Sequence, residues 1–404
     1  MSAQSDPPER TEEETRSGWV SEKKHCKHPL KLAVHSFEDS IPEFRSINMV
    51  SVLQPTQADS TQSHPLIPVG VDCGAGLVKI CIDSRGSQMR LRQPSKVLEL
   101  KTALIDDLSS KEGGQFFYHS GDRTNLIDRE FLTGELAASV APTTHIKLSD
   151  DPALKAEYCL HTLLGALATL PYRQEWNLFL VISTHSHALF NNKLKELTSG
   201  VHTVSFGGKN KPQVRVNITV GAVTPEGAGS YAYAKRLNII DPSAHVIGFD
   251  FGTSTVIPQV FAPGGKLIYH EPLEAGGCID LLEAIASDPE LLRFLGTGKP
   301  GNLELIRKGI ESGEFIYGTR NFNLRPVYAR HVKPWLADRL RLGLKATQEW
   351  LDSAESLVAW GGGSQMSGVS RMLSTQRIKT VPDGCWANAI GLQVVAAALL
   401  ARRA

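Results

Sequence analysis

The chain has 404 residues, of which 41% are hydrophobic, and a formal net charge of +1 at pH 7. This length is enough for two domains that each bury an apolar core. The near-neutral charge lacks the basic footprint of a protein that binds nucleic acid tightly, so we expect no direct contact with DNA or RNA. The six cysteines are scattered without a Cys-x-x-Cys pair, which favours reduced thiols over a disulfide framework.

Neither end of the chain has the pattern of a membrane or secretion signal. Residues 1–16 are polar and acidic, unlike a signal peptide. No run reaches the ~18–20 apolar residues of a membrane helix. The nearest candidate, residues 387–403, is interrupted by Gln393 and ends in Arg402 and Arg403, so we expect a packed C-terminal helix. These features predict a cytoplasmic protein without a membrane span.

Composition changes near residue 66. Residues 1–66 are rich in Ser, Glu, Lys, Pro and Gln, which predicts a largely disordered extension with one ordered patch around residues 30–44. From Ile67 onward, short apolar runs alternate with stretches of helical spacing. Strands are expected near residues 66–72, 77–83, 177–183 and 214–220, and a helix over residues 153–169. This order is typical of an α/β fold.

One short pattern occurs twice. Residues 70–74 read Gly-Val-Asp-Cys-Gly, and residues 248–252 read Gly-Phe-Asp-Phe-Gly. Each copy ends an apolar run and leads into a second run that closes in a turn. Both halves of the chain are therefore expected to open with the same β-hairpin, which predicts two similar domains that face each other across a cleft.

The two predicted hairpin turns have the composition of phosphate-binding loops. Glycine lets a tight turn present successive N–H groups to phosphate oxygens at close range. Asp72 and Asp250 would repel phosphate, so a cation is needed between these carboxylates and the phosphate. Hydrated Mg²⁺ is suitable because it prefers oxygen ligands. Lys79 can reach the β- and γ-phosphates. The predicted phosphate-binding residues are Gly74, Ala75, Gly76, Gly252, Thr253, Ser254 and Thr255. Either hairpin alone is also explained as an ordinary turn, and the pair favours a clamp.

Glu226 lies at a predicted junction between a strand and a helix. Residues 227–232 match a dinucleotide fingerprint, but Glu226 places a carboxylate where pyrophosphate would meet the helix. A carboxylate there complements the helix dipole by about 0.3–1 kcal/mol. The alternative is that it orients the water that attacks a γ-phosphate. Taken alone, the position favours the structural role.

Two further glycine clusters follow predicted strands or precede predicted helices. Gly361, Gly362, Gly363 and Ser364 follow an apolar run, and their backbone offers either a flat surface for a base or ribose, or a flexible loop. Gly276 and Gly277 precede a helical run, and they either line a nucleotide pocket or simply start the helix.

With these pieces in order, the chain resembles the actin-like ATPase superfamily. It looks most like the bacterial ParM/StbA-type actins that segregate plasmids, over roughly residues 67–401. The resemblance implies an α/β actin-like ATPase fold, in which two duplicated RNase H-like domains surround a nucleotide cleft. Domain I would be residues 67–244 completed by the C-terminal helix 385–404, and domain II residues 245–384.

The resemblance also implies a function. Residues 72–79 and 250–255 correspond to the two phosphate loops, Glu226 to the water-activating residue, and residues 361–363 to the adenosine loop. It implies a Mg²⁺-dependent ATPase whose ATP hydrolysis is coupled to self-assembly into a helical filament, with plasmid DNA held through a DNA-binding adaptor. A chromosomal cytoskeletal filament for cell shape, a small-molecule kinase and a non-polymerising nucleotide sensor remain alternatives. Cys73 and Cys278 depart from the family, because they lie in loops that usually face phosphate or nucleotide.

Overall fold

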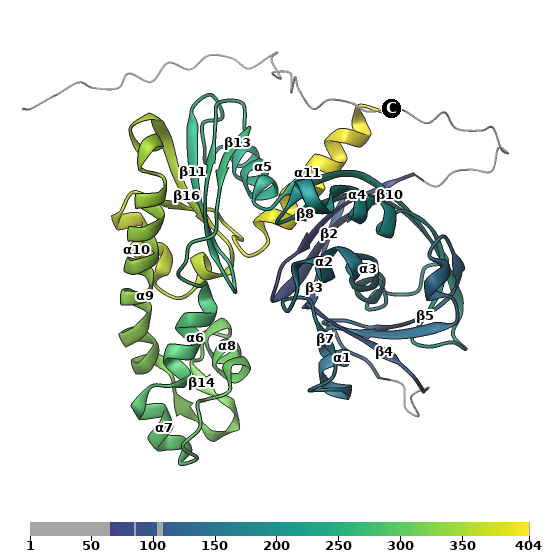
Figure 1. Cartoon of the computed structure of the whole chain (residues 1–404), viewed down its shortest axis with the longest axis horizontal. Coiled ribbons are helices and arrows are strands. Elements are labelled where there is room, and N and C mark those ends of the chain that lie inside the picture. Colours follow the sequence, from purple (N-terminus) through teal and green to yellow (C-terminus); the bar gives the residue numbers. More distant parts are fainter. Residues whose placement is uncertain (1–64, 85, 103–107, 404) are drawn as a thin grey trace, which may run out of the picture. The chain divides into compact units, whose positions relative to one another are not determined.

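A computed structural model of the chain describes residues 65–84, 86–102 and 108–403 (Figure 1). The predicted disorder of the N-terminal extension, and its ordered patch, concern residues outside these ranges. The elements fall into two main sheets with helices packed against them.

Among the described residues, the larger sheet has ten strands in the order β3-β2-β1-β8-β10-β9-β5-β6-β4-β7. Its strands are β1 (Ile67–Cys73), β2 (Leu77–Ser84), β3 (Ser87–Pro94), β4 (Lys96–Leu100), β5 (Gln115–Gly121), β6 (Arg129–Thr133), β7 (Ile146–Lys147), β8 (Glu175–Thr184), β9 (Gly200–Phe206) and β10 (Gln213–Pro225). The second sheet, ordered β13-β12-β11-β16-β17, contains β11 (His245–Phe251), β12 (Val256–Phe261), β13 (Leu267–His270), β16 (Ala354–Trp360) and β17 (Lys379–Thr380). A short hairpin pairs β14 (Ile316–Tyr317) with β15 (Phe322–Asn323).

The helices are distributed among these strands along the chain. They are α1 (Gly134–Val140), α2 (Pro152–Glu157), α3 (Cys159–Leu167), α4 (His187–Thr198), α5 (Ala228–Arg236), α6 (Cys278–Ala286), α7 (Pro289–Leu295), α8 (Leu303–Glu311), α9 (Arg325–Ala346), α10 (Val369–Thr375) and α11 (Ala387–Ala401). This mixture of helices and strands confirms the predicted α/β class.

The two sheets share one topology. In the larger sheet, β1 pairs antiparallel with β2 and parallel with β8, and β8 pairs parallel with β10. In the second, β11 pairs antiparallel with β12 and parallel with β16, and β16 pairs parallel with β17. The strands β3 and β13 complete the two sets as antiparallel edges. The structure therefore contains the duplication that the repeated Gly-x-Asp-x-Gly pattern predicts.

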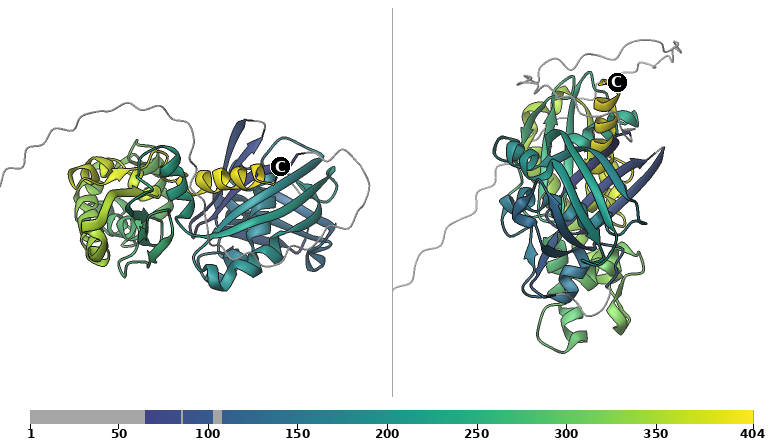
Figure 2. Two further views of the ribbon diagram at one scale, coloured as in Figure 1. Left: turned by 90° about the horizontal axis from the view of Figure 1, so that it is seen from above. Right: turned by 90° about the vertical axis from the view of Figure 1, so that its right-hand side faces the viewer.

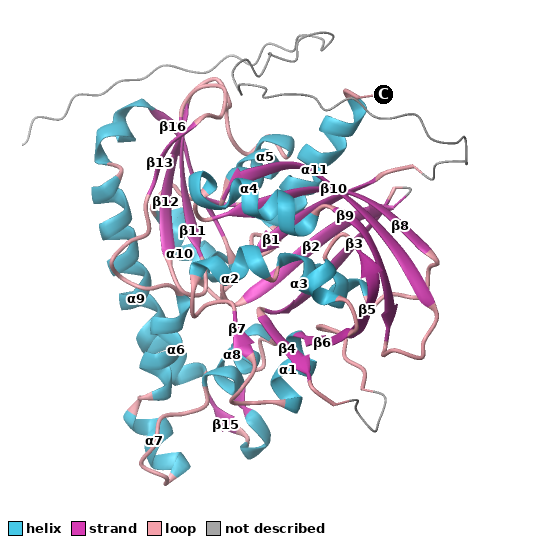
Figure 3. Ribbon diagram, turned by 45° about the vertical axis from the view of Figure 1, so that its right-hand side comes forward, coloured by secondary structure: helices cyan, strands magenta, loops and turns pink. Residues whose placement is uncertain are grey.

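The parallel strand β8 is buried on both faces, which explains its unbroken apolar sequence. Side chains alternate between the faces of a strand. Leu178, Leu180 and Ile182 accordingly join the core with residues of α3, whereas Phe179 and Val181 pack with residues of α11. The helices α3 and α11 lie on opposite sides of the larger sheet (Figure 3). One strand thus fixes helices on both sides of the larger sheet.

The predicted helix over residues 153–169 is in fact two helices. Helix α2 ends at Glu157, Tyr158 follows with a φ of −101° and a ψ of 10° that depart from helical geometry, and α3 then begins at Cys159. The ring of Tyr158 packs against His161, with centroids 4.9 Å apart. Tyr158 therefore separates the two helices.

The C-terminal helix α11 packs against β1, β8 and α5 (Figure 2), as the sequence predicts. A Cβ atom on Gly391 would lie 1.7 Å from the carbonyl oxygen of Gly229 in α5, so only glycine allows this close crossing. Among the described residues, no helix has the length and apolar character to cross a membrane.

Candidate functional site

The turns of the two duplicated hairpins lie against each other. Asp72 pairs with Lys79 across the β1–β2 hairpin, and Asp250 occupies the same position opposite Ile257 in the β11–β12 hairpin. A Cβ atom on Gly76 would lie only 2.9 Å from Oγ1 of Thr253 in the other turn. The two predicted phosphate loops are therefore neighbours in space, although 178 positions separate their equivalent aspartates, Asp72 and Asp250.

A cleft with a volume of about 1170 Å³ opens beside these turns. Small-ligand pockets usually measure about 300–1,000 Å³, so a nucleoside triphosphate has room here. Most of the predicted site residues line this cleft: Asp72, Gly74, Ala75, Gly76, Lys79, Glu226, Asp250, Gly252, Thr253, Ser254, Thr255, Gly361, Gly362 and Gly363. Gly276, Gly277 and Ser364 do not line it.

Gly276 and Gly277 belong to a segment that supports the turn between β11 and β12. Three successive N–H groups at the start of α6 donate to carbonyl oxygens of that turn: Gly277 to Ser254 at 3.0 Å, Cys278 to Gly252 at 3.0 Å, and Ile279 to Thr253 at 2.9 Å. These donors are used inside the protein and do not face a ligand. Of the two roles left open from the sequence, the structure favours the start of a helix over the lining of a pocket.

Ser364 likewise braces the third glycine segment. It is fully buried, and its hydroxyl donates to the carbonyl oxygen of Gly361 at 2.8 Å. Gly361 has a φ of +82°, and a Cβ atom there would lie 2.5 Å from Oδ1 of Asp250. Glycine is required at this position because the carboxylate of Asp250 lies directly against the backbone.

Asp72 is oriented by three different elements. Its Oδ1 accepts hydrogen bonds from Asn388 of α11 at 2.9 Å and from Ser183 of β8 at 3.3 Å. Its Oδ2 lies 3.3 Å from the ammonium of Lys79 on β2. With only 8% of its surface exposed, Asp72 is held in one direction, toward the cleft that it lines.

The charge of Lys79 is held in place by carboxylates. Burial by itself disfavours the ammonium, but Asp72 and Asp250 outweigh burial and raise the pKa of Lys79. The side chain predicted to reach phosphate is thus charged and paired with Asp72 in this structure.

Asp250 has no such partner. Its carboxylate makes no hydrogen bond or ion pair with the residues that the structure describes. Burial, and then the carboxylates of Asp72 and Glu226, raise the pKa of Asp250 to about 7, which Lys79 offsets only in part. A partly buried carboxylate that is destabilised by two others is a position where a cation would be stabilised.

The donor set fits hydrated Mg²⁺. Among the described residues, no three side chains of His, Cys, Asp or Glu are close enough to hold a metal ion directly. Mg²⁺ usually keeps several waters and takes only one or two protein carboxylates. Asp250, with Asp72 nearby, meets that requirement through oxygen atoms alone.

Glu226 follows the end of β10 and is fixed at both its backbone and its side chain. Its N–H donates to the carbonyl oxygen of Thr184 at 3.0 Å, and its own carbonyl accepts from Nε2 of Gln259 at 3.0 Å. Its Oε1 lies 3.4 Å from Nζ of Lys155. The side chain therefore pairs with a lysine at the cleft wall.

Sequence reasoning missed Lys155, Gln259 and Asn388. Lys155 and Asn388 line the cleft, and Gln259 lies buried behind Glu226. Each makes its contact with a residue far along the chain, and no local pattern marks such a pair.

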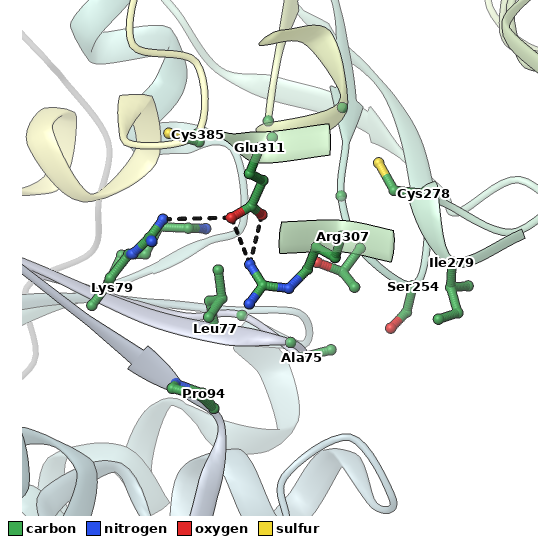
Figure 4. A pocket seen from close by; sticks show the side chains of 18 of the residues that line it. Ala75, Leu77, Lys79, Pro94, Ser254, Cys278, Ile279, Arg307, Glu311 and Cys385 are labelled. Atoms are coloured by element: carbon green, nitrogen blue, oxygen red, sulfur yellow. Dashed lines mark hydrogen bonds and ion pairs between the residues drawn. The ribbon is translucent and has the colours of Figure 1, made fainter. Parts of the chain in front are cut away.

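Helix α8 contributes a charged face that was also missed (Figure 4). Nη1 of Arg307 lies 2.6 Å from Oε2 of Glu311, and its Nη2 lies 2.6 Å from Oε1 of Glu304. Glu311 lies 4.0 Å from Arg92 of β3, which connects α8 to the larger sheet. Spacings of three and four residues on a helix are the signal that could have identified this face.

The two unusual cysteines have different surroundings. Cys73 does not line the cleft, and its sulfur lies 3.7 Å from that of Cys159 within the core beneath α3. Cys278 does line the cleft, where burial, and then Asp250, raise the pKa of its thiol to about 12. Neither thiol conflicts with a phosphate site, because one faces away from the cleft and the other stays neutral.

Known proteins share this fold. Residues 70–229 match the family model of the N-terminal domain of actin-like proteins. No curated protein matches the sequence. Among solved structures, the archaeal actin homologue Ta0583 superposes with a TM-score of 0.65 at 18% identity, over 82% of this chain and 99% of that one.

Two further solved structures give similar values. Bacillus thuringiensis ParM with ATP has a TM-score of 0.61 at 16% identity, over 84% of this chain and 100% of that one. The actin-like protein Alp7A has a TM-score of 0.59 at 16% identity, over 83% of this chain and 97% of that one. The resemblance deduced from the sequence is confirmed: the chain has the actin-like fold, and its first part matches the N-terminal domain of actin-like proteins.

Proposed function

We propose that this protein is an ATP-dependent, filament-forming ATPase. One observation carries the proposal: two glycine-rich hairpin turns meet at a cleft that Asp72, Asp250 and Glu226 all line. Glycine turns suit phosphate, the two aspartates suit a cation, and a separate glutamate suits the orientation of water.

Each group has one role in this proposal. The backbone N–H groups of residues 74–76 and 252–255 bind the phosphates, and Lys79 adds positive charge. Asp72 and Asp250 hold Mg²⁺ through water. When bound, Mg²⁺ supplies charge that neutralises the phosphate oxygens. Glu226 accepts a hydrogen bond from a water molecule and directs its oxygen toward the γ-phosphorus.

Hydrolysis needs Glu226 as a hydrogen-bond acceptor near the γ-phosphate. Its Oε1 lies 3.4 Å from the ammonium of Lys155. The carboxylate of Glu226 also contributes to the raised pKa of Asp250, so the two groups interact electrostatically.

Assembly follows from a division into two domains, which we place at residues 67–244 with 385–404, and at residues 245–384. A nucleotide that contacts both hairpin turns ties these domains together. Closure of this kind favours head-to-tail contacts between copies, and such heterologous contacts generate open filaments. Hydrolysis would then weaken them.

We further propose that the filament acts in the cytoplasm and moves or positions plasmid DNA through a DNA-binding adaptor. Structural likeness to ParM proteins supports this role. The net charge of +1 favours an adaptor over direct DNA binding.

The variant Glu226→Ala tests the ATPase. We expect phosphate release to fall by about 10²-fold or more, while ATP affinity stays within about threefold and sedimentable filaments persist. Glu157→Ala on α2, a solvated side chain outside the cleft, is the control. Turnover by the wild type without any added acceptor separates an ATPase from a small-molecule kinase. Normal turnover in the Glu226 variant would refute the assigned role.

A further inference from the structure

The backbone of Glu226 cannot move freely, so its side-chain direction depends on what the carboxylate meets. Thr184 accepts from its N–H at 3.0 Å, and Gln259 donates to its carbonyl at 3.0 Å. Gln259 is fully buried and comes from the second sheet. With both peptide groups fixed, the side-chain torsions of Glu226 are what remain to be set.

Lys155 is positioned to set the side-chain torsions of Glu226. It lies on α2, whose start is fixed by Pro152 and by Asp151, which accepts a hydrogen bond from the N–H of Ala153 at 2.7 Å. Its side chain is only 15% exposed, and that of Glu226 17%. An ion pair this sheltered is weakly screened by solvent, so it orients both side chains more firmly than a surface pair would.

The pairing of charges in the cleft has a pattern. Two of the three carboxylates assigned to the proposed site have a lysine partner: Asp72 with Lys79 at 3.3 Å, and Glu226 with Lys155 at 3.4 Å. Among the described residues, Asp250 has no lysine partner. The arrangement leaves Asp250 available to a cation, whereas Glu226 already has a cationic partner.

We propose that Lys155 is a positioning residue for ATP hydrolysis, whose ammonium holds Glu226 in the direction that binds the attacking water and away from the Mg²⁺ site. This inference rests on the proposed ATPase function. Without Lys155, Glu226 turns toward the cation with Asp250, and the water loses its acceptor. Misplacement of a reacting group by about 1 Å can cost roughly 10²-fold in rate.

A positioning role predicts a separation of rate from affinity. Lys155→Met removes the charge and keeps the length of the side chain. We expect its single-turnover rate of ATP hydrolysis to fall about 10- to 100-fold, while the dissociation constants of Mg-ATP and Mg-ADP change by less than about threefold. Lys155→Gln should behave in the same way and provides a second variant if the first is unstable. Lys155→Arg keeps the charge and should recover to within about fivefold of the wild type.

The control is Lys193→Met. Lys193 also pairs with a glutamate of α2, Glu157, at 4.0 Å, but both side chains are largely exposed and neither lines the cleft. Its rate should equal that of the wild type.

The outcomes are distinct. A wild-type rate in Lys155→Met, or no recovery in Lys155→Arg, overturns the inference while leaving the ATPase intact. A selective loss of ATP over ADP affinity that accounts for the whole rate defect also overturns it, because Lys155 would then bind the γ-phosphate directly. If the wild type itself does not hydrolyse ATP, the proposed function fails and this inference fails with it.

Discussion

Asn388 connects three parts of the site, and its replacement by aspartate is a demanding test of the geometry. Its Nδ2 donates to Oδ1 of Asp72 and to the hydroxyl of Ser183, both at 2.9 Å. Its Oδ1 accepts from the N–H of Gly229 at 3.1 Å. Asn388→Asp keeps the shape and the acceptor for Gly229, but it replaces the donor with a second carboxylate oxygen beside Asp72.

The cost can be worked from these distances. Two unit charges 3 Å apart repel by about 5 kcal/mol at an effective dielectric constant of 20. The lost hydrogen bond to a charged group adds about 1.5–3 kcal/mol. Because the cleft admits water and one carboxylate can take up a proton, we expect a net loss of about 3–5 kcal/mol at pH 8. Asn388→Ala removes the hydrogen bonds without adding charge and should cost about 1–3 kcal/mol.

Urea unfolding followed by tryptophan fluorescence measures both variants, with the exposed Asn192→Asp on α4 as control. The difference between Asn388→Asp and Asn388→Ala should shrink as the pH is lowered from 8 to 5, because protonation removes the repulsion. Equal stability of wild type and Asn388→Asp at pH 8 would refute the contact between Asn388 and Asp72.

Two further predictions depend on titration. The folded-state pKa of Asp250 is raised from 3.8 to about 7, so the folded protein loses stability as the pH rises through that window, and Asp250→Asn should unfold at a higher urea midpoint than wild type at pH 8 but not at pH 4. The same variant should lose Mg²⁺-dependent ATP binding in calorimetry, and unchanged affinity would count against the cation site. Burial lowers the pKa of His161 to about 3, so the unfolded chain takes up the proton first and stability falls as the pH drops from 6.5 toward 3. His161→Phe should flatten that acid limb in unfolding measurements between pH 7 and 4, and an unchanged slope would contradict the buried neutral imidazole.

The parts of the site that the sequence predicted are those encoded locally. Each hairpin is contained within one short stretch, residues 67–84 and 245–261, and apolar runs, a Gly-x-Asp-x-Gly pattern and a turn suffice to identify it. The repetition of that pattern also predicted the duplicated sheet topology. Such elements are recognisable because neighbouring residues determine them.

The remaining parts depend on contacts between distant positions. Lys155 meets Glu226 over 71 positions, and Asn388 meets Asp72 over 316. The direction of backbone N–H groups could not be predicted from the sequence either. Gly276 and Gly277 were candidates to line the nucleotide pocket, although the N–H groups of residues 277–279 donate to the turn between β11 and β12. Only packing reveals which side chains and which peptide groups remain free for a ligand.

The most direct test of the central claim is sedimentation of the full chain, with negative-stain microscopy of the pellet, in Mg-ATP, Mg-ADP and a non-hydrolysable ATP analogue. We predict filaments that form with ATP and disassemble as phosphate is released, persist with the analogue, and are absent with ADP. An unchanged supernatant in all three nucleotides, together with no phosphate release, would contradict an actin-like filament-forming ATPase.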